Sequence, residues 1–99
     1  MQLSNKQIKH LRGLAHDLKP VVMVGQNGLS ENVIEEIRGA LTFHELIKVK
    51  VSGYEGSDRQ EIVEQICNEQ KATHIQSIGK MVVLFKRNPN KIKIEIPKI

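Results

Sequence analysis

Segments with helical periodicity alternate with short β-branched runs along this chain. Three segments repeat apolar residues every three or four positions, as amphipathic helices do, and they begin at Ser4, Ser30 and Ser57. Four short runs rich in valine and isoleucine have the composition of strands, and they cover residues 21–24, 46–52, 74–78 and 81–85. The resulting order of helix, strand, helix, strand, helix, strand, strand predicts an α/β fold with a mixed sheet of about four strands and helices packed on it.

Each predicted helix begins at a residue that can cap it. Ser4 with Gln7, and Ser57 with Gln60, match the capping box, in which each side chain accepts a hydrogen bond from the other residue's backbone amide. Ser30 matches a simple N-cap. The expected inner faces of the three helices are Ile8, Leu11, Leu14, Ala15 and Leu18; Val33, Ile34, Ile37, Ala40 and Leu41; and Ile62, Val63, Ile66 and Cys67.

Proline marks the end of the first helix. Because Pro20 disfavours helical backbone at the residue before it, this helix is expected to end near Leu18. The run that follows, residues 21–24, is apolar throughout, which predicts a buried strand. The second helix is expected to end near Phe43 or His44.

The later strands carry a different pattern. Residues 46–52 alternate between apolar and polar side chains, so Lys48 and Lys50 are expected on an exposed, basic face of the sheet. Gly79 and Lys80 separate the last two strands, and a glycine in the first position of such a turn is typical of a type II′ hairpin.

Length and charge indicate one domain with a basic end. A chain of 99 residues fits one modest core, which we assign to residues 1–86, and residues 87–99 are expected to form a basic C-terminal tail or an edge strand. Nine of the eleven acidic residues lie between positions 31 and 69, while the last twenty residues are mostly basic. The charge is therefore segregated along the chain.

Composition narrows the class of protein further. The formal net charge of +4 and a pI near 9.4 permit a nucleic-acid partner without requiring one. The single cysteine, Cys67, has no partner for an internal disulfide, which favours a reducing compartment. We expect a cytoplasmic protein with no membrane contact, because the N-terminus does not resemble a signal peptide and no long apolar run occurs. We also expect a monomer.

A glycine-rich loop stands between the first strand and the second helix. It consists of Gly25, Gln26, Asn27 and Gly28, with Ser30 capping the helix directly after it. Glycines let the backbone approach a phosphate closely, and the first amides of a helix favour an anion. The loop lacks the patterns of nucleotide-binding loops, so a polymer backbone is the better anion. The alternative is that the loop only turns the chain from strand to helix.

Basic residues surround the loop in sequence. Lys6, Lys9, Arg12 and His16 share one face of the first helix, and Lys19 precedes the strand that leads into the loop. They are expected to extend a track of phosphate contacts. A solvated helix surface is the alternative interpretation, and for Lys48 and Lys50 it is the stronger one.

An enzyme finds little support in the sequence. The four histidines have no metal-ligand spacing, the paired carboxylates fall on outer helix faces, and Cys67 lies on an inner face. We therefore expect no catalytic residues, no metal and no cofactor. With only three aromatic residues, base stacking is expected to be minor and recognition to depend on RNA shape and backbone.

These residues together resemble a known family, the YhbY-like or CRM domain, named for chloroplast RNA splicing and ribosome maturation. The resemblance is carried by Leu11 and Ala15 and by residues 18–22, 24–29 and 44–50, which include a Leu-Lys-Pro motif leading into the GxxG loop. It runs from about residue 4 to residue 85. It is similar to the stand-alone bacterial members of the family.

The resemblance implies a fold and a function. The fold it implies is a mixed sheet similar to the C-terminal domain of translation initiation factor three. The implied function is RNA binding on precursors of the large ribosomal subunit, with Gly25 to Gly28 as an RNA contact. The turn containing Lys80 is also similar to a turn of the family, and a binding role there is a further expectation.

Two hypotheses about function remain. In the first, the protein is a large-subunit assembly factor that contacts ribosomal RNA through the GxxG loop and the basic helix face, with ribosomal proteins as further partners. In the second, it is an adaptor that docks on other proteins through its acidic helices, and the loop is plain architecture.

Overall fold

The computed structural model describes residues 2–98, and seven elements follow one another in the predicted order. Met1 and Ile99, the outer limits of the two predicted segments 1–86 and 87–99, lie outside the described residues. The elements are α1 (Asn5–Ala15), β1 (Pro20–Val24), α2 (Glu31–His44), β2 (Leu46–Val51), α3 (Gly56–Gln70), β3 (Thr73–Ile78) and β4 (Met81–Phe85). The prediction of an α/β domain with this order is confirmed.

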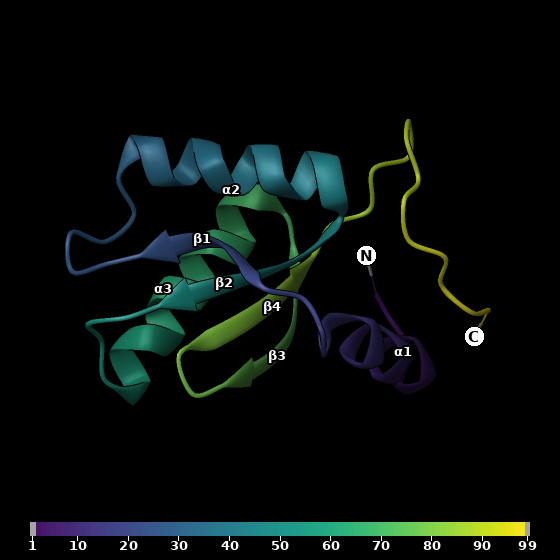
Figure 1. Cartoon of the computed structure of the whole chain (residues 1–99), viewed down its shortest axis with the longest axis horizontal. Coiled ribbons are helices and arrows are strands. Elements are labelled where there is room, and N and C mark those ends of the chain that lie inside the picture. Colours follow the sequence, from purple (N-terminus) through teal and green to yellow (C-terminus); the bar gives the residue numbers. More distant parts are fainter. Residues whose placement is uncertain (1, 99) are drawn as a thin grey trace.

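The four strands form one mixed sheet in the order β1-β2-β4-β3 (Figure 1). β1 pairs with β2 in parallel, and β4 pairs antiparallel with both β2 and β3. The parallel pair requires a crossover, which α2 supplies, whereas β3 and β4 form a hairpin. Gly79 in that hairpin has φ +57, and the φ of the following Lys80 is not positive, as expected for a type II′ turn.

The two faces of the sheet are covered unequally. Helices α2 and α3 pack on one face and form the larger core with β1, β2 and β4, through buried side chains that include Ile37, Leu41, Val49, Ile66 and Leu84. Helix α1 packs on the other face through Leu11 and Ala15, which contact a smaller cluster containing Leu46, Ile75, Val83 and Phe85. One short helix covers only part of its face, so a portion of the sheet stays open.

Three predictions about this side of the sheet are wrong. Helix α1 ends at Ala15 rather than near Leu18, and Leu14 and Leu18 are exposed rather than on an inner face. β1 was expected to be buried, but Val21 and Met23 are 50% and 59% exposed. The reason is tertiary: an apolar run does not specify what covers its second face, and α1 stops before it reaches β1.

Two of the three predicted caps are confirmed, and one is wrong. At α1 the amide of Gln7 donates to Ser4 Oγ (3.2 Å) and the amide of Ser4 donates to Gln7 Oε1 (2.9 Å). At α2 the amide of Val33 donates to Ser30 Oγ. Ser57 does not cap α3, because this helix already begins at Gly56 with the extended Glu55 as its N-cap. A capping box requires its serine at that extended position, and here the serine is already helical.

The chain after β4 folds back over α1 and is held by one carboxylate. Glu45, between α2 and β2, is fully buried at φ +65. Its carboxylate accepts hydrogen bonds from the amides of Asn88 (2.6 Å), Lys93 (2.7 Å) and Ile94 (2.9 Å), and Arg87 lies 3.1 Å away. Residues 86–98 form no strand, and this extended segment lies beside α1 in Figure 1.

Hydrogen bonds give Glu45 the charged state. Burial alone would raise the pKa of this carboxyl, but the amides of Asn88, Ile94 and Lys93 and the charge of Arg87 hold the pKa below its ordinary value. At the far end of the tail, the Gln7 side chain donates to the carbonyl of Pro97 (2.9 Å).

The helices among residues 2–98 are too short or too polar to span a bilayer.

Candidate functional site

The GxxG loop projects from one end of the sheet, between β1 and α2 (Figure 1). It is a tight turn in which the amide of Gly28 donates to the carbonyl of Gly25 (3.0 Å), and the amide of Ser30 donates to the carbonyl of Gly28 (3.1 Å). Gly25, Gln26 and Asn27 are exposed. The loop therefore presents its backbone and two amide side chains to solvent.

The two glycines of the loop have different roles. Gly28 has φ +72, and a Cβ there would lie 3.2 Å from the hydroxyl of Tyr54, so the turn itself favours glycine. Gly25 has no such requirement, because its φ lies outside the left-handed region and a Cβ would meet nothing within 4 Å. The absence of a side chain at Gly25 leaves open space outside the loop.

A second loop braces the first, and it was not predicted as part of the site. The hydroxyl of Tyr54 donates to the carbonyl of Gln26 (3.4 Å), and a Cβ on Gly53 would lie 2.7 Å from Gln26 Cγ. Arg59 holds this second loop by donating to the carbonyl of Tyr54 (2.8 Å). A signal for the contact exists in the sequence: β1 and β2 are consecutive strands, and the C-terminal ends of parallel neighbours meet at one edge of a sheet.

Lys80 lies at the same end of the sheet as the GxxG loop. The amide of Val51 donates to the carbonyl of Lys80 (2.8 Å), and the next amide, that of Ser52, donates to the carbonyl of Val24 (2.9 Å). The end of β2 is therefore flanked by the GxxG loop on one side and the β3–β4 turn on the other. Lys80 itself is exposed.

Lys48 and Lys50 lie on the open face of the sheet, between α1 and this end. Lys50 pairs in the sheet with Met23 of β1 and with Met81 of β4, and both lysines are half-buried. They share the face of β2 that carries Leu46, which contacts the α1 cluster. The expected basic face on β2 is therefore present, bordered by apolar side chains.

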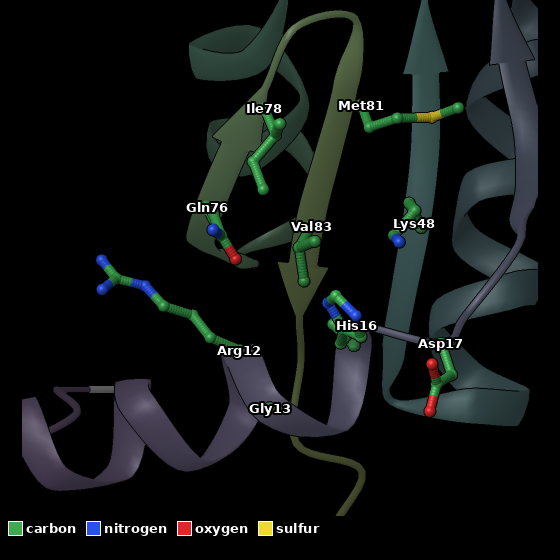
Figure 2. Close-up of a pocket in the computed structure, with 10 residues that line it drawn as sticks. Arg12, Gly13, His16, Asp17, Lys48, Gln76, Ile78, Met81 and Val83 are labelled. Carbon is green, nitrogen blue, oxygen red and sulfur yellow. The ribbon is translucent and has the colours of Figure 1, made fainter.

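The predicted basic residues of α1 are not beside the loop. Figure 1 shows α1 and the GxxG loop at opposite ends of the long axis. Arg12 and His16 line a cleft with Lys48 (Figure 2). Lys6 and Lys9 line a separate groove beside Pro97. Lys19 is exposed in the segment between α1 and β1. The structure brings Arg12, His16 and Lys48 together, and separates Lys6 and Lys9 from the loop.

Charge is divided between the two sides of the sheet. The side covered by α2 and α3 carries exposed acids, namely Glu31, Glu35, Glu36, Glu61, Glu64 and Glu69. The side with α1 and the open face carries Lys48, Lys50, Arg12 and His16, with Asp17 as the acid that borders the cleft. The segregation seen along the chain thus becomes a segregation in space, and an anion is favoured on the open side.

The chemistry available at the loop is anion binding by backbone amides. Glu31 adds a negative charge in the first turn of α2, so a phosphate fits better against Gly25 to Asn27 than against the helix itself. Away from this site, burial raises the pKa of the Cys67 thiol, and the charge of Glu64 raises it further. A raised pKa disfavours the reactive thiolate.

Comparison with known proteins gives one family. The CRS1/YhbY (CRM) domain matches residues 3–86. A Haemophilus influenzae protein named RNA-binding protein is 50% identical over 96 residues, which cover 97% of this chain and 96% of that protein. A probable RNA-binding protein of Pseudomonas aeruginosa is 42% identical over 89 residues, 90% of this chain and 86% of that protein.

A more distant relative and a solved structure agree with this result. A probable RNA-binding protein of Bacillus subtilis is 36% identical over 95 residues, 96% of this chain and 99% of that protein. The solution structure of a hypothetical protein from Staphylococcus aureus matches with a TM-score of 0.83 at 34% identity, and the match covers 97% of this chain and 100% of that one. The resemblance drawn from the Leu-Lys-Pro and GxxG motifs is confirmed, and this chain belongs to the CRS1/YhbY (CRM) domain family.

Proposed function

We propose that this protein binds RNA through the loop Gly25–Gly28 and the basic residues of the open sheet face. Gly25 carries the proposal, because the fold itself gives no reason for a glycine there and a ligand approaching the backbone does. The relatives from Haemophilus, Pseudomonas and Bacillus bear the name RNA-binding protein or probable RNA-binding protein, which supports RNA as the ligand.

In this proposal a phosphate is held by the amides of the loop. The side chains of Gln26 and Asn27 add hydrogen bonds to phosphate or sugar. Tyr54 keeps the loop in place through the hydrogen bond of its hydroxyl to the carbonyl of Gln26. Contacts of this kind position a backbone without reading its sequence. The ligand class is therefore RNA recognised by its backbone and shape, which the sparse aromatic content of the protein also favours.

Basic residues of the open side extend the contact. Lys80 stands beside the loop, Lys50 and Lys48 lead across the sheet, and Arg12 and His16 line the cleft from α1 and its end. Three further cations, Lys6, Lys9 and Lys19, are exposed on and just after α1, where they suit a long RNA. The acids of α2 and α3 lie on the other side, where they repel RNA from the wrong face.

Binding should depend steeply on salt. For about three to five phosphate contacts, the logarithm of the association constant should fall with the logarithm of salt concentration with a slope between about −2 and −4. Lys48→Gln should make this slope shallower by about one, as measured by fluorescence anisotropy with labelled RNA. The control is Lys71→Gln at the end of α3, which should leave the slope unchanged. Equal slopes for the two variants would remove Lys48 from the contact.

The finer proposal is that the RNA is ribosomal RNA in precursors of the large subunit, as the family resemblance implies. Sucrose-gradient fractionation of lysate at low and high salt tests it. We expect the protein to migrate with large-subunit particles at low salt, to leave them at high salt, and to be absent from them in the Gly25→Leu variant. Migration that survives Gly25→Leu would instead favour an adaptor docked through the acidic helices.

A further inference from the structure

A cleft lies between α1 and the open face of the sheet (Figure 2). Its volume is about 660 Å³, within the range of sites that hold small ligands. Figure 2 shows Lys48, Met81, Val83 and Gln76 from three neighbouring strands on one side, with α1 on the other. The cleft is therefore large enough for one nucleotide and is formed by elements far apart in the sequence.

The floor of the cleft is apolar and continues onto exposed apolar surface. Met81, Val83 and Ile78 line it, and Ile78 is 66% exposed. In the same row across the sheet Met23 is 59% exposed, and Lys50, which pairs with both Met23 and Met81, stands between them. Apolar side chains gathered on an open face usually mark a binding surface. They suit the flat face of a base.

The rim of the cleft is polar and mainly basic. Lys48 reaches it from β2, and Arg12 and His16 border it from α1, while Asp17 is the acid among the lining residues. Gln76 contributes an amide that can both donate and accept hydrogen bonds. An apolar floor with cations and one amide around it complements a ligand that is flat, bears hydrogen-bonding edges and carries negative charge.

We infer that this cleft receives an unpaired nucleotide of the bound RNA. The base lies on Met81 and Val83 with its edge toward Gln76, and Lys48 and Arg12 take the adjoining phosphates. Paired bases in a duplex are stacked and cannot enter such a cleft, so the RNA class is a single-stranded loop, bulge or end. The inference rests on the proposed function and deepens it, because it names which part of the RNA is recognised.

The cleft and the GxxG loop are placed to hold one strand. Lys48 lines the cleft, and Lys50 follows two residues later, about 7 Å further along β2 toward the loop. Beyond Lys50, β2 ends between the GxxG loop and Lys80. An RNA strand that leaves the cleft thus meets cations on its way to the GxxG loop.

Two variants with the same substitution test the inference. Gln76→Ala removes the amide that lines the cleft, and Gln65→Ala makes the same change on the exposed surface of α3. The probes are a single-stranded oligouridylate and a blunt RNA duplex of similar charge, titrated against the full chain. We expect Gln76→Ala to bind the oligouridylate about fivefold more weakly, in line with the loss of one hydrogen bond to the base edge, and the duplex nearly as wild type. Gln65→Ala should bind both probes as wild type.

Photocrosslinking provides a measurement that does not depend on a variant. Oligouridylate carrying 4-thiouridine should crosslink to the strands that line the cleft, at or next to Met81 or Gln76, as mapped by mass spectrometry. Circular dichroism melting should show that both alanine variants stay folded, since neither glutamine side chain is fully buried.

The outcomes separate this inference from the proposed function. Equal oligouridylate affinity for Gln76→Ala and Gln65→Ala, with no crosslink in the cleft, overturns the inference and leaves the loop proposal standing. Failure of wild-type protein to bind either RNA overturns both. If Gln76→Ala keeps its RNA affinity but leaves the ribosomal particles, the cleft docks a protein and the inference is wrong.

Discussion

Replacing Glu45 with glutamine should lower the free energy of unfolding by about 3 kcal/mol, which is a large share of the stability of a small domain. The carboxylate is fully buried, and its two oxygens accept from the amides of Asn88, Lys93 and Ile94 and from Arg87. In either orientation, the glutamine amide group would face at least one backbone N–H that also donates. A buried donor without an acceptor is costly. Urea denaturation at neutral pH measures the effect.

The matched control is Glu35→Gln, which removes an exposed partner of Arg38 at 2.6 Å. Both side chains of that pair are more than half exposed, so the change should stay within about 0.5 kcal/mol. The Glu45→Gln variant should also be cleaved faster by trypsin after Arg87 and Lys91, because the tail is no longer held. Equal stability of the two variants would mean that Glu45 does not hold the tail.

Acid should remove the difference between wild type and the Glu45 variant. Because the folded-state pKa of Glu45 is lowered, its contribution is complete above the ordinary carboxyl value of about 4.3 and is lost as pH falls through the lower folded value. The wild-type and variant unfolding curves should therefore converge in acid. A difference that persists at the lowest pH would point to packing rather than charge.

Replacing Gly25 with leucine should weaken RNA binding by more than about tenfold while the fold is retained. A Cβ at this position meets no protein atom within 4 Å and the backbone is not left-handed, so stability should change by less than about 1 kcal/mol. The side chain would instead stand between the loop amides and a phosphate. Loss of one or two charge-assisted hydrogen bonds accounts for the expected loss of affinity. Fluorescence anisotropy with labelled RNA and thermal unfolding are measured on the same samples.

Gly39→Leu serves as the control here, since it adds the same side chain to a site on α2 with equally open surroundings. Gly28 is less suitable for this test, because its φ of +72 and its contact with Tyr54 make any side chain there destabilising. Unchanged RNA affinity for Gly25→Leu would show that the loop is only a turn between β1 and α2, and the RNA contact would then lie elsewhere on the open face.

Local signals predicted the elements well, and they failed where a choice depended on context. The capping box at Ser4, the cap at Ser30 and the turn at Gly79 all involve groups within a few residues, so their geometry follows from short-range contacts alone. Ser57 offered the same motif as Ser4, yet α3 begins at Gly56. There the chain is held by Arg59 on the carbonyl of Tyr54, in a loop shaped by its contact with the GxxG loop.

The candidate site was predictable in its chemistry and less so in its layout. Gly25 to Gly28 stood out because glycine spacing and a following cap form a contiguous motif. Tyr54, which contacts that loop, lies 28 residues from Gln26 and carries no motif of its own. The basic helix face was visible in the sequence, but the periodicity of one helix does not show that α1 sits at the end of the sheet opposite the GxxG loop.

The sequence by itself determined the order of helices and strands, the glycine loop and the family of this chain, because each depends on neighbouring residues or on a contiguous pattern. Tertiary structure decided three other features: the burial of Glu45, the exposure of Met23 and the division of the basic residues between the loop and the α1 cleft. The first two depend on what covers a surface and the third on where α1 packs, and in each case the deciding contacts come from segments distant along the chain. A charged residue such as Glu45 is ordinarily exposed, and its burial follows only from the tail that closes over it. The apolar strand β1 was predicted to be buried, and its exposure follows from α1, which is too short to cover it.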